Sequence, residues 1–129
     1  MNKKILVLAS IFGLLAVIIG AFAAHGLRPK ISASSLQSFE TGVRYQMYHA
    51  FLLLFIGNME VVNTKNKKII YYLVLFGVLL FSGSIYALAT NNLTIFDFKI
   101  IGFITPFGGL LLILAWLVLL INFVKTIKN

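Results

Sequence analysis

Four long apolar runs, separated by short polar segments, dominate the pattern of this chain. They cover about residues 5–24, 41–60, 69–90 and 100–124 of the 129. A helix needs roughly 20 mostly apolar residues to cross the hydrocarbon of a bilayer, and each run reaches that length. The pattern therefore predicts an all-α integral membrane protein, with one four-helix bundle as a single domain over residues 1–129.

The composition supports the membrane class. Hydrophobic residues make up 60% of the chain and charged residues only 11%, whereas soluble proteins carry about 25% charged residues. The chain contains no cysteine, so disulfides, thiolate metal sites and cysteine nucleophiles are excluded.

The first apolar run also has the features of a cleavable secretory signal. Two lysines precede it, and residues 21–23 (Ala-Phe-Ala) resemble a signal cleavage site. However, the run is as long as a true span, and Ala16, Gly20 and Ala24 recur every four residues, which gives a smooth face for close helix packing. We expect the first helix to be retained. Cleavage is the alternative and would leave three spans.

The net charge of +8 is concentrated at the ends of the apolar runs. If the four spans alternate across a membrane, one side receives Arg28, Lys30 and Lys99 and the other side receives seven lysines. Basic residues favour the cytoplasmic side, which predicts a multi-pass plasma-membrane protein with both termini in the cytoplasm. Anionic lipid headgroups, rather than nucleic acid, are the expected partners of the seven: Lys3, Lys4, Lys65, Lys67, Lys68, Lys125 and Lys128.

The second helix is expected to begin before its apolar run. Ser34 followed by Gln37 has the form of a capping box, in which both side chains bind backbone donors at a helix start. A helix over residues 35–60 would be about 39 Å long, which exceeds a hydrocarbon core of roughly 30 Å. Its first turns should therefore lie at the outer interface, or the helix should tilt.

Residues 39–49 (FETGVRYQMYH) place several polar side chains at the entrance to this span. Helical spacing predicts an ion pair between Glu40 and Arg44, which would make each charge tolerable in poorly solvated surroundings. Interfacial anchoring of the arginine and tyrosines is the structural alternative. His49 lies about 13 Å beyond Glu40 along the axis, so we expect it either to bind a ligand or proton or to be a satisfied packing residue.

Polar residues also occupy the outward halves of the other helices, while the cytoplasmic halves are almost unbroken hydrocarbon. The pattern predicts one outward-opening polar pocket above an apolar floor, without a continuous pore through one monomer. The candidate pocket residues are His25, Glu40, Arg44, Tyr45, Tyr48, His49, Ser82, Ser84 and Thr105.

Glycine and proline suggest an irregular fourth helix. Pro106 removes one backbone hydrogen bond, and glycines expose the backbone to a neighbour or ligand. Interrupted helices build substrate sites in transporters, but membrane helices also use these residues for ordinary packing and kinks. We favour packing for Gly20, Gly83, Pro106, Gly108 and Gly109.

Sequence templates for catalysis are absent. There is no phosphate-binding glycine loop, HExxH helix or GxSxG elbow, and only three acidic residues. His25 and His49 lack a metal-binding spacing, so we expect neither a metal nor a cofactor. A relay of Ser82 or Ser84 with His49 has no more specific support.

Four motifs resemble the small YgdD/YwdK-like membrane proteins, a group described as a domain of unknown function. They are GAFAAHGL (20–27), TGVRYQMYHAFLLL (41–54), LFSGSIYALA (80–89) and ITPFGGLLLILAW (104–116). The resemblance implies four membrane spans and no mechanism. Ala23 departs from the glycine expected there. By position, the family's motif residues match Ala24, His25, Gly26, Arg44, Tyr45, Tyr48, His49, Ser82, Gly83, Ser84, Thr105, Pro106, Gly108 and Gly109.

Three classes of function are compatible with this pattern. The favoured one is a non-catalytic bundle that binds lipid or a partner protein through its polar pocket. The alternative is an oligomeric carrier or channel for protons, ions or a small polar solute. A membrane enzyme acting on lipid-linked substrates is the third. A homo-oligomer or a membrane-protein partner is compatible with the small-residue helix faces, and the fold alone does not separate these classes.

Overall fold

Four long helices make up most of the computed structural model, which describes residues 1–94 and 101–126. A short π-helical turn, η1 (Ala23–Leu27), follows the first helix, and a 3-10 turn, η2 (Asn91–Leu93), follows the third. No strand occurs within these ranges, so the predicted all-α class is confirmed. The long helices are α1 (Asn2–Phe22), α2 (Ala33–Asn58), α3 (Thr64–Ala89) and α4 (Ile104–Thr126).

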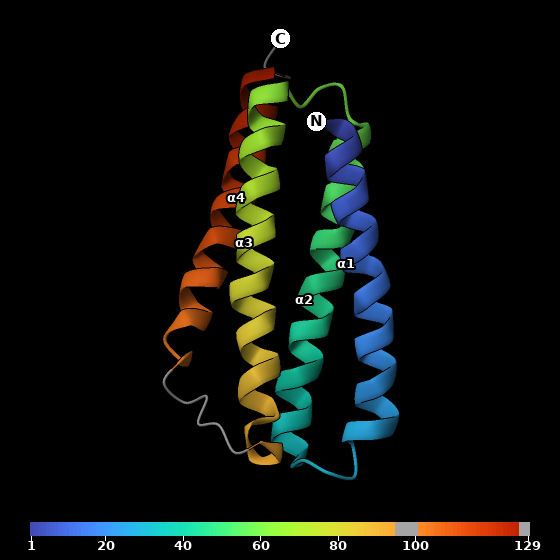
Figure 1. Ribbon diagram of the computed structural model, residues 1–129. Coiled ribbons are helices and arrows are strands. Elements are labelled where there is room, and N and C mark those ends of the chain that lie inside the picture. Colours follow the sequence, from blue (N-terminus) through green and yellow to red (C-terminus); the bar gives the residue numbers. More distant parts are fainter. Residues whose placement is uncertain (95–100, 127–129) are drawn as a thin grey trace.

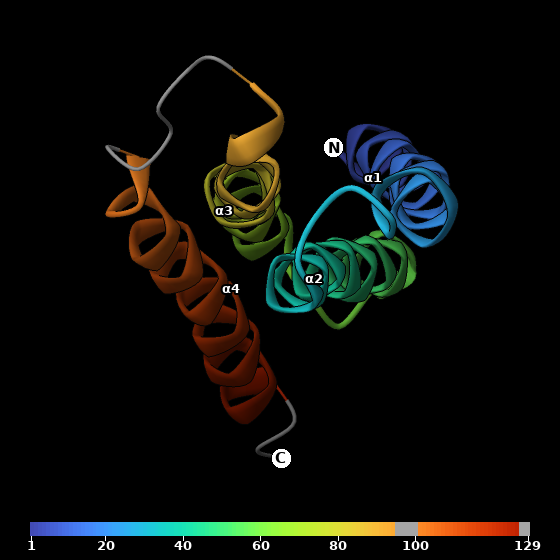
Figure 2. The same cartoon turned by 90° about the horizontal axis from the view of Figure 1, so that it is seen from below.

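The helices run up and down in chain order, and α1 begins at the end of the bundle where α4 ends (Figure 1). Seen along the helices, they stand in a curved row in which each helix packs on its neighbours in the sequence (Figure 2). Helices α1 and α4 occupy the two ends of the row. The bundle is therefore open, and α4 is held mainly by α3.

Three of the long helices are long and apolar enough to cross a membrane, namely α1 with η1, α3 and α4. Helix α2 has the length, at 26 residues, but its first third is polar, so length and composition alone do not mark it as a span. Of the residues used in the sequence analysis, Lys99, Ile100 and Lys128 lie outside the described residues.

Helix α2 begins two residues before the expected start. Ser32 is its N-cap, in an extended conformation, and the Ser35 backbone N–H donates to the Ser32 hydroxyl at 3.1 Å. The predicted capping box of Ser34 and Gln37 is therefore wrong. Two serines at neighbouring positions offer alternative caps, and the chain uses the one that directly follows the loop.

Helix α3 begins earlier than expected, and helix α4 is more regular at its start than expected. Asn63 caps α3 by accepting the Asn66 backbone N–H at 2.8 Å, so α3 begins five residues before the predicted 69. Pro106 lies in the first turn of α4, where its missing N–H has no intrahelical partner to lose. Helix α4 is consequently continuous, and the predicted irregularity is absent from it.

Helices α1 and α2 approach each other along a seam of small residues. A Cβ added at Gly20 would lie 3.3 Å from the Val43 side chain. Ala24, which the four-residue interval places on this face, is exposed. The seam instead alternates steps of four and three, which keeps it facing one partner helix. It runs through Ala9, Gly13, Ala16, Gly20 and Ala23, and the last of these is buried despite replacing the expected glycine.

Helices α3 and α4 make the closest backbone approach. A Cβ at Gly108 would lie 2.3 Å from the Phe81 backbone nitrogen, and a Cβ at Gly77 would lie 2.6 Å from Leu112. Gly109 has only ordinary contact with the Phe81 ring, at 3.5 Å. At Gly83 an added Cβ meets nothing within 4 Å, so this glycine faces away from its neighbours.

Two apolar cores stabilise the bundle at different heights. The larger core fills the half in which α1 begins and α4 ends, with Ile5, Leu53, Ile56, Ile70 and Val74 among its members. The smaller core lies at the opposite end and contains Ala23, Leu27, Phe39 and Ala89. Buried polar side chains lie between the two cores, and these form the candidate site.

The Gly108 contact generates a stability prediction. We expect Gly108→Ala to lower the thermal unfolding temperature, because the new methyl group must push α3 and α4 apart, and overpacking of this kind costs about 1–3 kcal/mol. The matched control is Gly83→Ala, which fills open space and should leave stability unchanged or slightly raised. Thermal unfolding in detergent micelles measures both. Equal effects of the two substitutions would contradict the packing role of Gly108.

Candidate polar site between helices α2, α3 and α4

Gln46 links three helices at the level between the two cores. Its side chain is 4% exposed, its Nε2 donates to the Phe12 carbonyl of α1 at 2.8 Å, and its Oε1 accepts from the Tyr86 hydroxyl of α3 at 2.7 Å. Neither Gln46 nor Tyr86 is among the residues predicted for the site. The available signal was the polarity of Gln46 within an apolar face, because a buried amide requires hydrogen-bond partners.

The predicted serines lie at two different helix contacts. The Ser82 hydroxyl is buried and donates to the Gly42 carbonyl of α2 at 2.7 Å. The Ser84 hydroxyl binds the Thr105 hydroxyl of α4 and also donates to the Phe81 carbonyl at 3.0 Å. Ser82 therefore joins α2 to α3, and Ser84 joins α3 to α4.

The side chain of His49, on α2, is buried against α4. Its Nδ1 lies 2.6 Å from the Tyr45 carbonyl, and its Nε2 accepts the indole N–H of Trp116 at 3.2 Å. The Tyr45 ring packs against Phe81 of α3, with centroids 5.0 Å apart. Trp116 is a further site residue that the sequence analysis missed, since an isolated tryptophan on an apolar helix carries no signal of its partner.

The predicted ion pair between Glu40 and Arg44 does not form. The Arg44 Nη2 instead donates to the Thr41 hydroxyl at 2.9 Å, and this hydroxyl donates to the Gln37 carbonyl at 3.1 Å. No salt bridge joins any of the described residues to Arg44. The threonine one turn earlier offers an acceptor already fixed in place, and binding it directs the guanidinium back toward the N-terminal end of α2.

Two other predicted residues lie apart from the buried polar groups. His25 is exposed in η1, which directly follows α1. Tyr48 is 52% exposed and packs on Tyr45, with ring centroids 5.7 Å apart. The nine predicted residues therefore do not enclose one common pocket.

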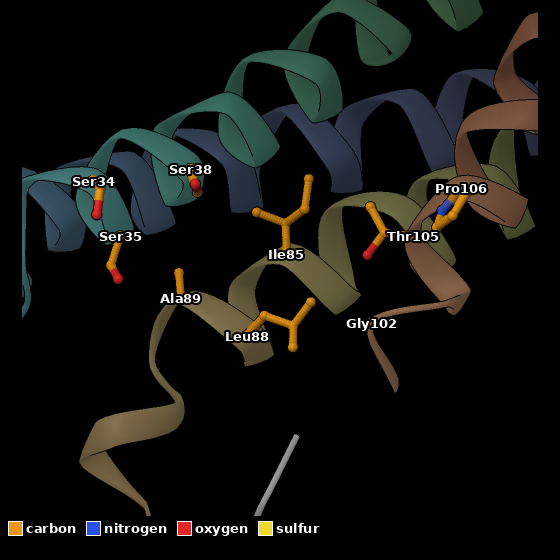
Figure 3. A pocket seen from close by; sticks show the side chains of 9 residues that line it. All are labelled: Ser34, Ser35, Ser38, Ile85, Leu88, Ala89, Gly102, Thr105 and Pro106. Atoms are coloured by element: carbon orange, nitrogen blue, oxygen red, sulfur yellow. The ribbon is translucent and has the colours of Figure 1, made fainter. Parts of the chain in front are cut away.

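Two separate hollows along α2, α3 and α4, which together we call the valley, replace the predicted single pocket. The first hollow, which we call the serine pocket, has a volume of about 530 Å³ and lies at the N-terminal end of α2 (Figure 3). Three serines of α2 face helix α3 and the start of α4 across it. The lining residues are Ser34, Ser35, Ser38, Ile85, Leu88, Ala89, Gly102, Thr105 and Pro106.

The second part of the valley, which we call the aromatic groove, has a volume of about 310 Å³. It begins one helical turn from the serine pocket, at Gly109 after Pro106 on α4 and at Phe81 before Ile85 on α3. The valley thus changes from hydroxyl-lined to mostly apolar along its length. The groove is lined by Tyr45, His49, Phe81, Gly109, Leu112, Ile113 and Trp116.

The chemistry of the site is hydrogen bonding without a catalytic constellation. A nucleophilic serine needs a base within hydrogen-bond reach, but the hydroxyls of Ser82 and Ser84 are bound elsewhere than to His49. Every buried side-chain nitrogen and oxygen in residues 1–94 and 101–126 has a partner. The same residues contain no group of three His, Asp or Glu side chains able to hold a metal ion.

A second polar cluster, also missed by the sequence analysis, lies at the other end of the bundle. The Asn122 Oδ1 accepts hydrogen bonds from Asn63 and Asn66, and its Nδ2 donates to the Val61 carbonyl at 2.9 Å. The Lys67 ammonium is nearly buried and donates to the Asn2 side chain at 3.0 Å. These contacts fasten α4 and α1 to the start of α3, far from the serine pocket.

Comparison with known proteins places the chain in a family. The sequence profile of the family described as "Protein of unknown function (DUF423)" matches residues 19–109. The chain belongs to this family. The DUF423 assignment agrees with the resemblance stated from the motifs, and no solved structure matches the chain.

Relatives of this DUF423 chain are named membrane proteins. A UPF0382 membrane protein of Staphylococcus saprophyticus is 42% identical over 95% of this chain and 98% of its own length. A UPF0382 membrane protein of Staphylococcus epidermidis is 40% identical over 95% of this chain and 97% of its own length. Together with the three apolar helices, these relatives establish the chain as a membrane protein of a family whose function is unknown.

The Gln46 contacts generate a second stability prediction. Gln46→Leu should destabilise the bundle by about 1–3 kcal/mol, because it leaves the Tyr86 hydroxyl without its acceptor and removes the link to α1. Tyr86→Phe removes only the hydroxyl and should cost less. A double-mutant cycle of these substitutions, measured by unfolding in mixed micelles, isolates their coupling. Strictly additive effects would show that the side chains do not interact.

Proposed function

We propose that this protein is a non-catalytic, four-pass plasma-membrane protein that binds a phospholipid in the valley between α2, α3 and α4. The serine pocket receives the headgroup, and the aromatic groove receives an acyl chain. The observation that carries the proposal is the alignment of a hydroxyl-lined pocket and a mostly apolar groove along the same three helices, one helical turn apart. An amphipathic molecule requires this change of chemistry along its binding site.

The direction of the helices supports four membrane passes. Helices α1 and α3 run the same way, and both are apolar enough to span (Figure 1). Helix α2 joins their opposite ends, so it must return across the same thickness. Its polar character is then accommodated by contacts inside the bundle, as a membrane span requires for polar groups.

The basic residues support the orientation of the bundle. Exposed lysines gather at the end where α1 begins and α4 ends, including Lys3, Lys4, Lys65 and Lys68. Basic residues favour the cytoplasm, which directs both termini inward and the serine pocket outward. Anionic lipid headgroups of the cytoplasmic leaflet are the natural partners of these lysines.

The height of the valley fits the outer edge of the hydrocarbon. The contact of Ser82 with Gly42 and that of Ser84 with Thr105 place these residues at one level, close to the predicted start of the second span. The serines that line the pocket lie beyond this level, where headgroups are found. The aromatic groove lies on its other side, where Tyr45 and His49 are about 4–11 Å into the hydrocarbon from Gly42 at roughly 1.5 Å per residue.

Arg44 supports a phosphate-containing headgroup. It is exposed, directly precedes Tyr45 of the aromatic groove in the sequence, and its guanidinium reaches toward the start of α2 through Thr41. It pairs with no carboxylate among the described residues, and an arginine near hydrocarbon is costly unless its charge is compensated. Guanidinium groups bind phosphate well because several N–H donors match its oxygens.

The first test fills the groove. Gly109→Leu should weaken lipid binding about tenfold, because the leucine side chain would occupy the groove in place of the acyl chain. The helix packing should tolerate the change, since an added Cβ at Gly109 makes only ordinary contact with Phe81. Gly83→Leu is the control, since it adds the same side chain on a face away from the valley. Native mass spectrometry with phosphatidylglycerol measures binding. Equal binding by both variants would remove the groove from the proposal.

The second test addresses the headgroup. Arg44→Gln should reduce the preference for phosphatidylglycerol over an uncharged diacylglycerol, because the cation near the phosphate is lost. Arg28→Gln, which removes an exposed arginine from the loop after α1, is the control. If neither lipid binds and the wild-type protein instead moves protons or solutes in liposomes, the carrier alternative replaces this proposal.

A further inference from the structure

The hydrogen bonds of His49 define the state of its imidazole. A backbone carbonyl only accepts hydrogen bonds, and an indole N–H only donates them. The nitrogen facing the Tyr45 carbonyl must therefore carry a proton, and the nitrogen facing Trp116 must not. These contacts require a neutral ring with its hydrogen on Nδ1.

A second proton on this ring is incompatible with the contact to Trp116. Protonation places an N–H on Nε2, where it points at the indole N–H. The hydrogen bond between the two rings is then lost, and two donors oppose each other at a separation of 3.2 Å. The contact to the Tyr45 carbonyl survives, because it already uses a protonated nitrogen.

The surroundings of His49 make it the group on which the contact depends. On α2, the titratable group against it is the Tyr45 phenol, with ring centroids 6.4 Å apart. Helix α3 contributes Phe81 and α4 contributes Leu112 and Trp116 to the same groove. None of the described charged side chains lines the aromatic groove, and none of its lining residues comes from α1.

The contact matters because α4 is otherwise joined to α2 weakly. Helix α4 packs on α3, and its C-terminal part is fastened by Asn122. Between these attachments, the bond from Trp116 to His49 spans the aromatic groove from α4 to α2. The indole is about half exposed, so it has room to leave this position.

We propose that His49 and Trp116 form a proton-controlled latch across the aromatic groove. The neutral imidazole holds the indole against α2, and protonation releases it and widens the groove. The latch depends only on the protein, so it stands or falls separately from lipid binding.

The composition of the chain makes the latch directly measurable. Trp116 is the only tryptophan, and His25 is the only other histidine. In lipid nanodiscs, the Trp116 emission should change in one transition as the pH falls from about 8 to 4, because a histidine can gain its second proton in this interval. His49→Gln should abolish the transition, because the amide oxygen still accepts the indole N–H but does not titrate. His25→Gln should retain it.

Two further measurements leave His49 and Trp116 unchanged. Nitrogen-15 NMR of labelled histidine should show the Nδ1–H form above the transition and a doubly protonated ring below it. Because the chain has no cysteine, spin labels at Phe51→Cys and Leu117→Cys report the distance between α2 and α4, which should lengthen below the transition. A neutral Nε2–H form, a transition retained in His49→Gln, an emission that does not change or an unchanged distance would each overturn the proposal.

Discussion

Polar groups between membrane helices must find partners within the protein, and this constraint organises the whole bundle. Hydrocarbon offers no hydrogen bonds, so each polar side chain in the interior has to meet another helix. Gln46 meets this requirement most completely, because one amide binds both α1 and α3. Ser82, Ser84 and His49 repeat the solution on a smaller scale, and each joins a pair of helices.

Small residues determine how tightly each pair of helices packs. Glycine at position 108 allows the backbones of α3 and α4 to touch, while the seam of alanine and glycine on α1 accepts the side chains of α2. No comparable seam joins α4 to α2. That difference leaves the valley between them, which is bridged by aromatic rings and a single histidine bond instead of close backbone contact.

The helices themselves were predictable from the four apolar runs, although α2, whose first third is polar, is not marked as a span by length and composition alone. The sequence did not predict details for which neighbouring side chains compete, such as the helix cap and the partner of Arg44. The sequence alone does not distinguish Ser32 from Ser34 as the N-cap of α2. It also offers Arg44 two partners one turn away, Glu40 and Thr41, and the structure shows the bond to Thr41.

The candidate site was predictable as a polar level on α2 but not as a set of contacts. Periodicity shows which helix face carries Tyr45 and His49, yet it carries no information about which residue of α4 lies opposite them. Trp116 and Tyr86 became site residues only through the relative height of the helices. The predicted common pocket does not form, because the Ser82 hydroxyl is hydrogen-bonded to the Gly42 carbonyl and the Ser84 hydroxyl to Thr105. Two separate hollows occur instead.

The curved row also bears on how the chain is made. Each helix contacts chiefly the one synthesised just before it, so every hairpin can close as soon as it leaves the ribosome and enters the bilayer. Few contacts await a distant part of the sequence, which favours rapid assembly. The last helix then docks on a three-helix unit whose central glutamine already has both of its partners.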